Sequence, residues 1–187
     1  MTTWSYSAIK EFKTCPRKYH ASRVEKLYPF QQSAAAKYGN EVHEAAELYV
    51  RDGSPMPGNM VQYTTVLDKL AAIEGTKHCE YKMALTEDLE VCDFDDDGRW
   101  VRGIADLVIV NRNKAFVVDY KTGSDKYPDK DQLELMTLMV FVHFPEVIKV
   151  KAALVFLTRD NIFTEAYTRR KAAKQWKGWR SKIVELD

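Results

Sequence analysis

The chain has 187 residues, with 28 Lys and Arg against 27 Asp and Glu for a formal net charge of +1, and 45% of its residues are hydrophobic. This length and composition are typical of one folded domain with its own core and exclude a chain that is disordered as a whole. The three cysteines are an odd number, no apolar run reaches the length of a membrane helix, and no apolar leader is present, so we expect a cytoplasmic protein without a disulfide scaffold, membrane span or signal peptide.

The first third of the chain has the sequence pattern of helices. A helix is expected from about Ser7, and Pro16 interrupts it and restarts a short turn. A second helix is expected over Ser33 to Arg51, ending before Gly53, and a third over Met60 to Thr76.

The spacing of apolar residues then changes to the alternation of strands, beginning with Tyr81 to Leu85. Two β-branched segments on either side of the turn-like Asn111 to Lys114 predict an antiparallel hairpin. The remaining expected elements are hairpin strands over Trp100 to Val110 and Ala115 to Lys121, a helix from Asp129 or Asp131 to Pro145, strands over Val150 to Leu157 and Ile162 to Tyr167, and a basic helix from about Arg169. This order predicts a single α/β domain over residues 1–187, with a central mixed β-sheet flanked by helices.

The charges are unevenly distributed. The segment Glu87 to Asp97 carries seven acids and no base, whereas Arg169 to Lys182 carries seven bases and no acid. In the basic segment Trp176 and Trp179 are interleaved with cationic residues, namely Lys174, Lys177 and Arg180. This face could pack on the sheet with its bases in solvent, or it could bind nucleic acid, with the bases on phosphates and a tryptophan stacked on a nucleobase.

Part of the acidic segment is similar to a calcium-binding EF-hand loop. Asp93, Asp95 and Asp97 are followed by Gly98, as in the first half of such a loop. The position that requires a bidentate glutamate is Ile104, which cannot coordinate a cation. A solvated hairpin turn is therefore the favoured interpretation.

The residues best suited to chemistry are in the predicted hairpin. Asp119 and Lys121 are two positions apart on one strand and therefore project from the same face, and hairpin pairing brings Asp106 alongside them. Both carboxylates lie in otherwise apolar strands, where an unpaired charge is costly. Carboxylates are the ligands that Mg²⁺ and Mn²⁺ prefer, and a neighbouring ammonium can stabilise charge on a phosphate, so the pattern predicts metal-assisted phosphodiester cleavage rather than a solvated pair of strand charges.

Asp106, followed after twelve residues by Asp119-Tyr-Lys121, resembles the PD-(D/E)XK nuclease superfamily, and in particular its RecB-like branch. The resemblance extends over Trp4 to Met136. The other matching segments are Ser5-Tyr-Ser7, Cys15-Pro-Arg-Lys-Tyr19, Gly39-Asn-Glu-Val-His43-Glu44 and Gln132-Leu.

The resemblance implies a restriction-endonuclease-like fold and a role for each matching residue. His43, Asp106, Asp119 and the carbonyl of Tyr120 would bind Mg²⁺ or Mn²⁺. Lys121 would position or activate the attacking water, and Gln132 would support the site or the scissile phosphate. Glu80 is either an accessory acid for a second metal or a solvent-facing strand residue. The other histidines match no motif and are interpreted as structural or surface residues: His20, His78 and His143.

Three features of the sequence depart from the family pattern. Ala105 occupies the position of the proline, and Met136 occupies the position where a tyrosine usually follows Gln132. Some relatives hold an iron–sulfur cluster through one cysteine at the Cys-Pro motif and three near the carboxyl terminus. Here the only cysteines are Cys15, Cys79 and Cys92, so we expect no such cluster.

The sequence therefore predicts a deoxyribonuclease that acts on DNA ends or single strands, with exonuclease activity as the first expectation. The expected context is recombination, repair or phage DNA processing, with a helicase or recombination protein as a partner, and this part rests on analogy to the family. A structure-specific endonuclease is one alternative. A non-catalytic nucleic-acid-binding module that retains the nuclease fold is the other.

Overall fold

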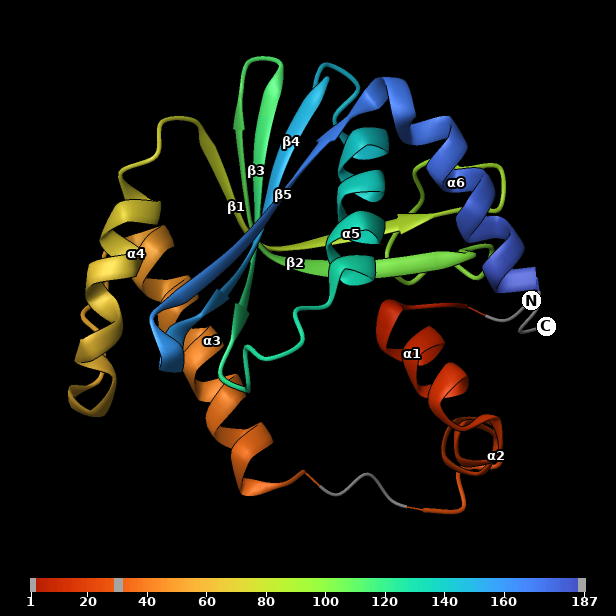
Figure 1. The fold of residues 1–187 in the computed structure, drawn as a ribbon, viewed down its shortest axis with the longest axis horizontal. Helices are drawn as coiled ribbons and strands as arrows, with labels where there is room; N and C mark the ends of the chain where they lie inside the picture. The colour runs from red at the N-terminus through yellow and green to blue at the C-terminus, as the bar shows by residue number, and fades with distance from the viewer. Residues whose placement is uncertain (1–2, 29–31, 185–187) are drawn as a thin grey trace.

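A five-stranded mixed sheet forms the centre of the molecule in a computed structural model that describes residues 3–28 and 32–184 (Figure 1). The spatial order is β1-β2-β3-β4-β5, and β3 and β4 are parallel whereas the other neighbours are antiparallel. The strands are β1 (Thr76–Leu85), β2 (Val101–Asn111), β3 (Lys114–Lys121), β4 (Lys149–Phe156) and β5 (Asn161–Thr168). The expected α/β class with a mixed sheet is confirmed.

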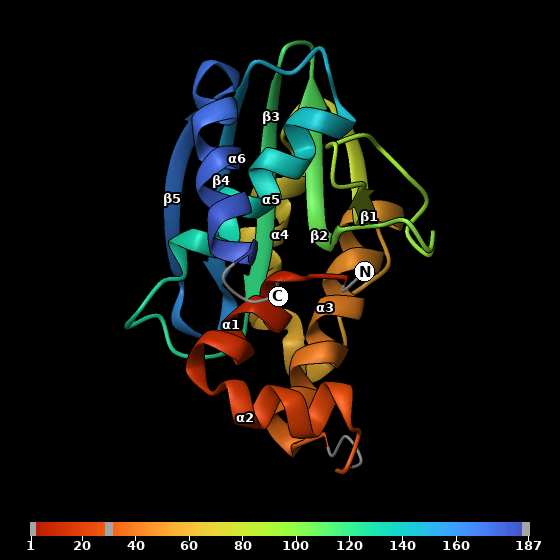
Figure 2. The same ribbon diagram turned by 90° about the vertical axis from the view of Figure 1, so that its right-hand side faces the viewer.

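Helices cover both faces of this sheet, as the two perpendicular views show (Figures 1 and 2). One face is covered by α3 (Ala34–Asp52) and α4 (Thr64–Ala71), preceded by the 3₁₀ turn η2 (Gly58–Tyr63). The other face carries α1 (Tyr6–Thr14), α5 (Lys130–His143) and α6 (Arg169–Val184). The remaining short elements are α2 (Pro16–Tyr19), the π-helical η1 (His20–Val24) and the 3₁₀ turn η3 (Leu157–Arg159). None of the helices in the described part of the chain is long and apolar enough to cross a membrane.

The helix boundaries follow from identifiable caps. The hydroxyl of Ser5 accepts the N–H of Ala8 at the start of α1, and the hydroxyl of Ser33 accepts the N–H of Ala36 at the start of α3. Helix α3 ends at Gly53, whose φ of 71° is the left-handed conformation that glycine adopts without strain. The restart at Pro16 is also as expected, since α2 begins there.

The region from 58 to 80 differs from its expected structure. The single helix expected over Met60 to Thr76 is instead η2 followed by α4, which ends at Ala71. Gly75, with φ of 136°, then turns the chain into β1, and a Cβ at this position would meet the Val110 carbonyl oxygen at 2.6 Å. Strand β1 begins at Thr76, earlier than expected, because its first half is a half-buried edge strand whose side chains show little alternation.

Strands β1 and β2 bend together near the middle of the sheet (Figure 1). On β2, Val101 and Ala105 belong to the apolar cluster under α5, and Leu107 and Ile109 belong to the cluster under α3 and α4. Val108 returns to the α5 side, so the alternation of faces is broken between Ala105 and Val108. This break places Asp106 at the bend.

Candidate metal centre

Two carboxylates converge at the carboxyl end of β3. The β2–β3 ladder ends at the pair of Leu107 with Val118, so the next position on each strand brings Asp106 opposite Asp119. Both side chains are buried, at 9% and 6% exposure. The structure thus brings the two acids together in the register that hairpin pairing predicts.

Asp106 links the strand hairpin to helix α3. Its Oδ2 accepts the backbone N–H of Tyr120 at 2.5 Å, and its Oδ1 lies 3.4 Å from Nδ1 of His43. Burial lowers the pKa of the His43 imidazole, but the hydrogen bond and negative charge of Asp106 outweigh burial and leave this pKa raised above its ordinary value. His43 on α3 therefore faces the carboxylate of Asp106 at the end of the strand hairpin.

A glycine allows α3 to approach the strand end closely. Gly39 lies one helical turn before His43, and a Cβ at Gly39 would be 3.1 Å from the hydroxyl oxygen of Thr122. Thr122 directly follows Lys121 at the end of β3. The glycine of the Gly-x-x-x-His segment therefore has a packing reason, because it lets His43 approach Asp106.

Asp119, Lys121 and Gln132 form a closed polar triangle. The Nζ of Lys121 is 2.6 Å from Oδ2 of Asp119 and donates to Oε1 of Gln132 at 3.0 Å. The Nε2 of Gln132 donates to Oδ1 of Asp119 at 2.6 Å. Gln132 lies in the first turn of α5, so this helix fixes the orientation of both charged groups from the other face of the sheet.

Glu80 joins the carboxylates on the α3 side. The flanking pairs Cys79–Leu107 and Tyr81–Ala105 place Glu80 opposite Asp106, and a φ of 46° at Glu80 is unusual for a strand residue. Ligand atoms of His43, Glu80 and Asp106 lie within 4.8 Å of one another. They line a cavity of about 320 Å³. The sequence offered Glu80 only as an alternative, because its left-handed backbone conformation has no signal in the pattern.

The donor set fits a divalent cation. Burial, followed by the charge of Asp106, raises the pKa of Asp119 to about 6 despite the opposing effect of Lys121. Burial and the same Asp106 charge also raise the pKa of Glu80. Buried carboxylates that repel one another, with an imidazole beside them, are stabilised by a bound cation, and oxygen-rich sites of this kind suit Mg²⁺ or Mn²⁺.

Metal binding should depend on pH in a defined direction. Below a pH of about 6 Asp119 of the metal-free protein holds a proton that a cation has to displace. Mn²⁺ is therefore expected to bind about tenfold more weakly at pH 5 than at pH 7, with proton release that decreases as the pH rises. Titration calorimetry in two buffers of different ionisation enthalpy measures both quantities, and an affinity that is constant over this range would contradict the prediction.

The structure settles the packing of the two tryptophans of α6. Trp176 and Trp179 are buried, at 5% and 1% exposure, and Nε1 of Trp179 donates to Glu134 of α5 at 3.1 Å. The stacking of these rings on a nucleobase, one of the two alternatives, is therefore wrong for this conformation, because no ring face is available. Lys174 and Lys177 remain exposed on α6. Arg180 is exposed as well, and its guanidinium donates to the carbonyl of Glu87 in the acidic segment.

The structure also shows the surroundings of Met136, of Cys15 and of the acidic segment 93–98. Met136 is buried under the sheet beside Gly103, and just before α5 the carboxylate of Asp129 accepts a hydrogen bond from the hydroxyl of Tyr6. Cys15 caps α2 by accepting the N–H of Lys18. The segment 93–98 forms turns in the loop between β1 and β2, where Gly98 N–H donates to Asp96 Oδ1 at 2.6 Å.

Comparison with known proteins finds a matching family model, and solved structures that are similar to this chain. The model of the PD-(D/E)XK nuclease superfamily matches residues 3–186. The crystal structure of a proposed exonuclease from Eubacterium rectale superposes with a TM-score of 0.55 at 13% identity, covering 97% of this chain and 79% of that chain. The crystal structure of SSO0001 superposes with a TM-score of 0.48 at 16% identity, covering 100% of this chain and 78% of that chain. No curated protein sequence matches.

Proposed function

The chain belongs to the PD-(D/E)XK nuclease superfamily, and we propose that it is a Mg²⁺- or Mn²⁺-dependent deoxyribonuclease that degrades DNA from its ends or as single strands. The observation that carries this proposal is the convergence of two buried carboxylates and an ammonium from two paired strands, with Asp106 on β2 and Asp119 and Lys121 on β3. A cluster of buried acids in which the pKa of Asp119 is raised is more typical of a functional site than of a structural pair.

The metal ligands of this proposal are His43, Asp106, Asp119 and the carbonyl of Tyr120, with Glu80 as a further acid on the α3 side. Ligand atoms of His43, Glu80 and Asp106 lie within 4.8 Å of one another, whereas the carboxylate of Asp119 contacts Lys121 and Gln132 in the metal-free protein. A divalent cation held there supplies the positive charge that polarises the phosphodiester and offsets negative charge in the transition state. The fit of the donor set and the raised pKa values of Asp119 and Glu80 support this assignment.

The chain's own groups have separate tasks in hydrolysis. Lys121 Nζ, fixed by Asp119 and Gln132, donates hydrogen bonds to the attacking water and to the phosphoryl oxygens. The water oxygen attacks phosphorus and loses one proton to solvent, and the bond from phosphorus to the leaving sugar oxygen breaks. The leaving oxygen takes up a proton from solvent and becomes a hydroxyl. Gln132 holds Lys121 and Asp119 in place and does not itself change its protonation state.

One comparison supports exonuclease action over the alternatives, and one feature of α6 suits DNA binding in any of the three candidate functions. The superposed Eubacterium rectale protein is itself described as a proposed exonuclease. The exposed bases Lys174, Lys177 and Arg180 on α6 offer phosphate contacts without a separate recognition domain. We place the activity in cytoplasmic recombination, repair or phage DNA processing, with a helicase or recombination protein as partner.

The products of end-labelled DNA distinguish the three candidate functions. Linear single-stranded and duplex DNA with a 5′ or 3′ label is incubated with Mg²⁺, Mn²⁺ or chelator, beside circular single-stranded DNA of the same sequence. An exonuclease releases short products from linear DNA and leaves the circle intact, and the label released first gives the polarity. Cleavage of the circle would contradict exonuclease action and support the endonuclease, and binding without cleavage would support the non-catalytic module.

A further inference from the structure

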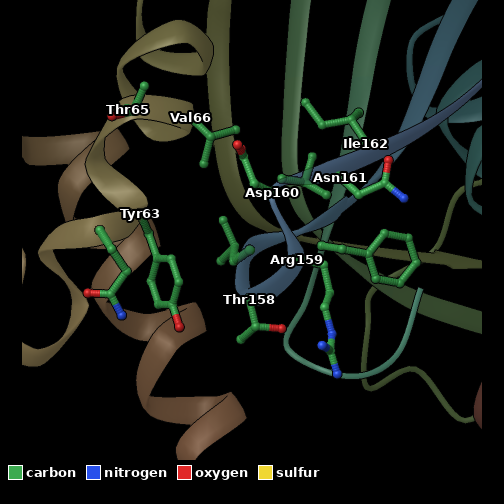
Figure 3. A pocket seen from close by; sticks show the side chains of 12 residues that line it. Tyr63, Thr65, Val66, Thr158, Arg159, Asp160, Asn161 and Ile162 are labelled. Carbon is green, nitrogen blue, oxygen red and sulfur yellow. The ribbon is translucent and has the colours of Figure 1, made fainter. Parts of the chain in front are cut away.

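A cavity of about 690 Å³ lies between η2–α4 and the turn that joins β4 to β5 (Figure 3). Its apolar wall includes Tyr63, Val66 and Ile162, and the side chain of Ile162 remains 48% exposed. Its polar rim includes Arg159 and Asp160. The cavity shares no lining residue with the metal centre.

This cavity lies at the same end of the sheet as the metal centre, beyond the carboxyl ends of β3 and β4. Strands β3 and β4 are parallel, and Lys121 pairs with Phe156 at their carboxyl ends. Arg159 follows Phe156 through the turn η3, so its Cα lies about 8 Å from that of Lys121, given strand spacing near 4.8 Å and a 3₁₀ rise near 2.0 Å. Ligands of open α/β sheets bind outside the carboxyl ends of the parallel strands.

Two hydrogen bonds tie the β4–β5 turn to the segment that follows Lys121. The hydroxyl of Thr158 donates to the carbonyl of Thr122 at 3.2 Å, and the amide nitrogen of Asn161 donates to Oδ2 of Asp125 at 2.9 Å. Thr122 also contacts the Gly39 position of α3. The cavity is therefore held in a fixed position relative to the catalytic strand.

The rim of the cavity has a positive and a negative end. Figure 3 shows the Asp160 carboxylate directed toward Val66 and the Arg159 guanidinium directed away from it, beside Thr158. Arg159 forms no ion pair with any residue of 3–28 and 32–184. An exposed guanidinium without a partner is suited to bind a phosphate through two parallel hydrogen bonds.

We infer that this cavity is a nucleotide subsite for the DNA strand next to the scissile bond, with a backbone phosphate on Arg159. The sugar and base lie against Val66 and Ile162, toward the Asp160 end, where a carboxylate accepts hydrogen bonds from sugar or base and repels a second phosphate. The inference rests on the proposed function and names a substrate contact that none of the family-motif residues provides.

The test compares Arg159→Ala with Arg159→Lys and with Lys114→Ala. Lys114 is an exposed base at the other end of β3, about 23 Å from Lys121 at 3.3 Å per residue. Binding of a fluorescein-labelled single-stranded oligonucleotide is measured by anisotropy with chelator present, over a series of salt concentrations. Cleavage of the same oligonucleotide with Mg²⁺ gives kcat and KM.

Arg159→Ala is expected to weaken binding about tenfold and to reduce the slope of log K against log salt by about 0.7, the value for one single-strand phosphate contact. The KM of Arg159→Ala is expected to rise, while its kcat at saturating DNA stays within about twofold of wild type. Arg159→Lys is expected to keep the salt slope, because it keeps the charge. Lys114→Ala is expected to resemble wild type in binding and in cleavage. Wild-type affinity and slope in Arg159→Ala would overturn the subsite. The two proposals can also fail separately. If wild type cleaves no DNA but Arg159→Ala still weakens DNA binding, the proposed function is contradicted and the subsite is retained.

Discussion

Replacing Asp119 by asparagine is expected to reduce metal-dependent DNA cleavage at least about a thousandfold, because the substitution removes the charge of a buried ligand at the catalytic strand end. Asparagine has the shape of aspartate, and its amide oxygen can still accept the hydrogen bond from Gln132 while its NH2 group replaces the oxygen that faces Lys121. The loss therefore reports on charge and not on packing.

The same substitution should stabilise the metal-free protein. The unfolded chain ionises this carboxyl near the ordinary pKa of 3.8, whereas the folded protein retains the proton up to about pH 6. The free energy of unfolding of the metal-free protein consequently falls as pH rises through this window, and the cost is fully present above it. Asparagine carries no charge, so at pH 7.5 we expect a gain on the order of 3 kcal/mol, from a rise of the pKa from 3.8 to about 6 at 1.36 kcal/mol per unit of pKa.

Urea unfolding with chelator present and cleavage kinetics with Mg²⁺ measure the two effects on the same sample. Asp97→Asn is the matched control, since Asp97 is an exposed acid of the β1–β2 loop and should change neither quantity. A variant that lost both activity and stability would indicate that Asp119 has a structural role instead.

Replacing Lys121 by alanine is expected to reduce kcat by about a hundredfold to ten-thousandfold. Lys121 Nζ lies 2.6 Å from Asp119 and is held by Gln132, so its removal takes away the donor nearest to the reacting groups and leaves the carboxylates in place. Binding of Mn²⁺ should persist or strengthen, because a cation that competes for Asp119 is gone.

Single-turnover cleavage and Mn²⁺ titration separate these effects, with Lys114→Ala on the same strand as the control. If Lys121→Ala retained full activity, the ammonium would have only the structural role of neutralising Asp119. If it lost metal binding together with activity, the fold of the site would depend on the ion pair.

The strand hairpin was predictable because its register is set by a short turn. The Asn111–Lys114 pair closes the hairpin, and counting back along both strands places Asp106 opposite Asp119. The face of Lys121 follows from the two-residue period of a strand. His43 and Gln132 could be assigned only through resemblance to a family, because nothing local shows which residue of a helix faces a distant strand.

Other features depend on tertiary structure that leaves no local pattern. Glu80 reaches the metal centre through a left-handed residue at a bend shared by β1 and β2. The burial of Trp176 and Trp179 depends on how α6 docks beside α5, and a basic helix with spaced aromatics has the same sequence pattern in either orientation. The cavity at Arg159 joins segments almost a hundred residues apart in the chain, from Gln62 to Ile162.

The two buried acids also illustrate why the site is locally costly. Asp106 and Asp119 lie in largely apolar strands, and burial followed by the charge of Asp106 raises the pKa of Asp119. Lys121, His43 and the N–H of Tyr120 compensate part of that cost in the metal-free protein. The remainder is relieved by a cation, so the affinity for metal and the low stability of the metal-free site have the same origin.

An end-labelled single-stranded oligonucleotide incubated with wild-type protein and with Asp119→Asn, in Mg²⁺, in Mn²⁺ and in chelator, tests whether the metal centre cleaves DNA. We expect cleavage by wild type with either metal, none with chelator, and at least about a thousandfold less by the variant. Cleavage that persists in chelator, or that Asp119→Asn retains at the wild-type rate, would contradict the assignment of this metal centre.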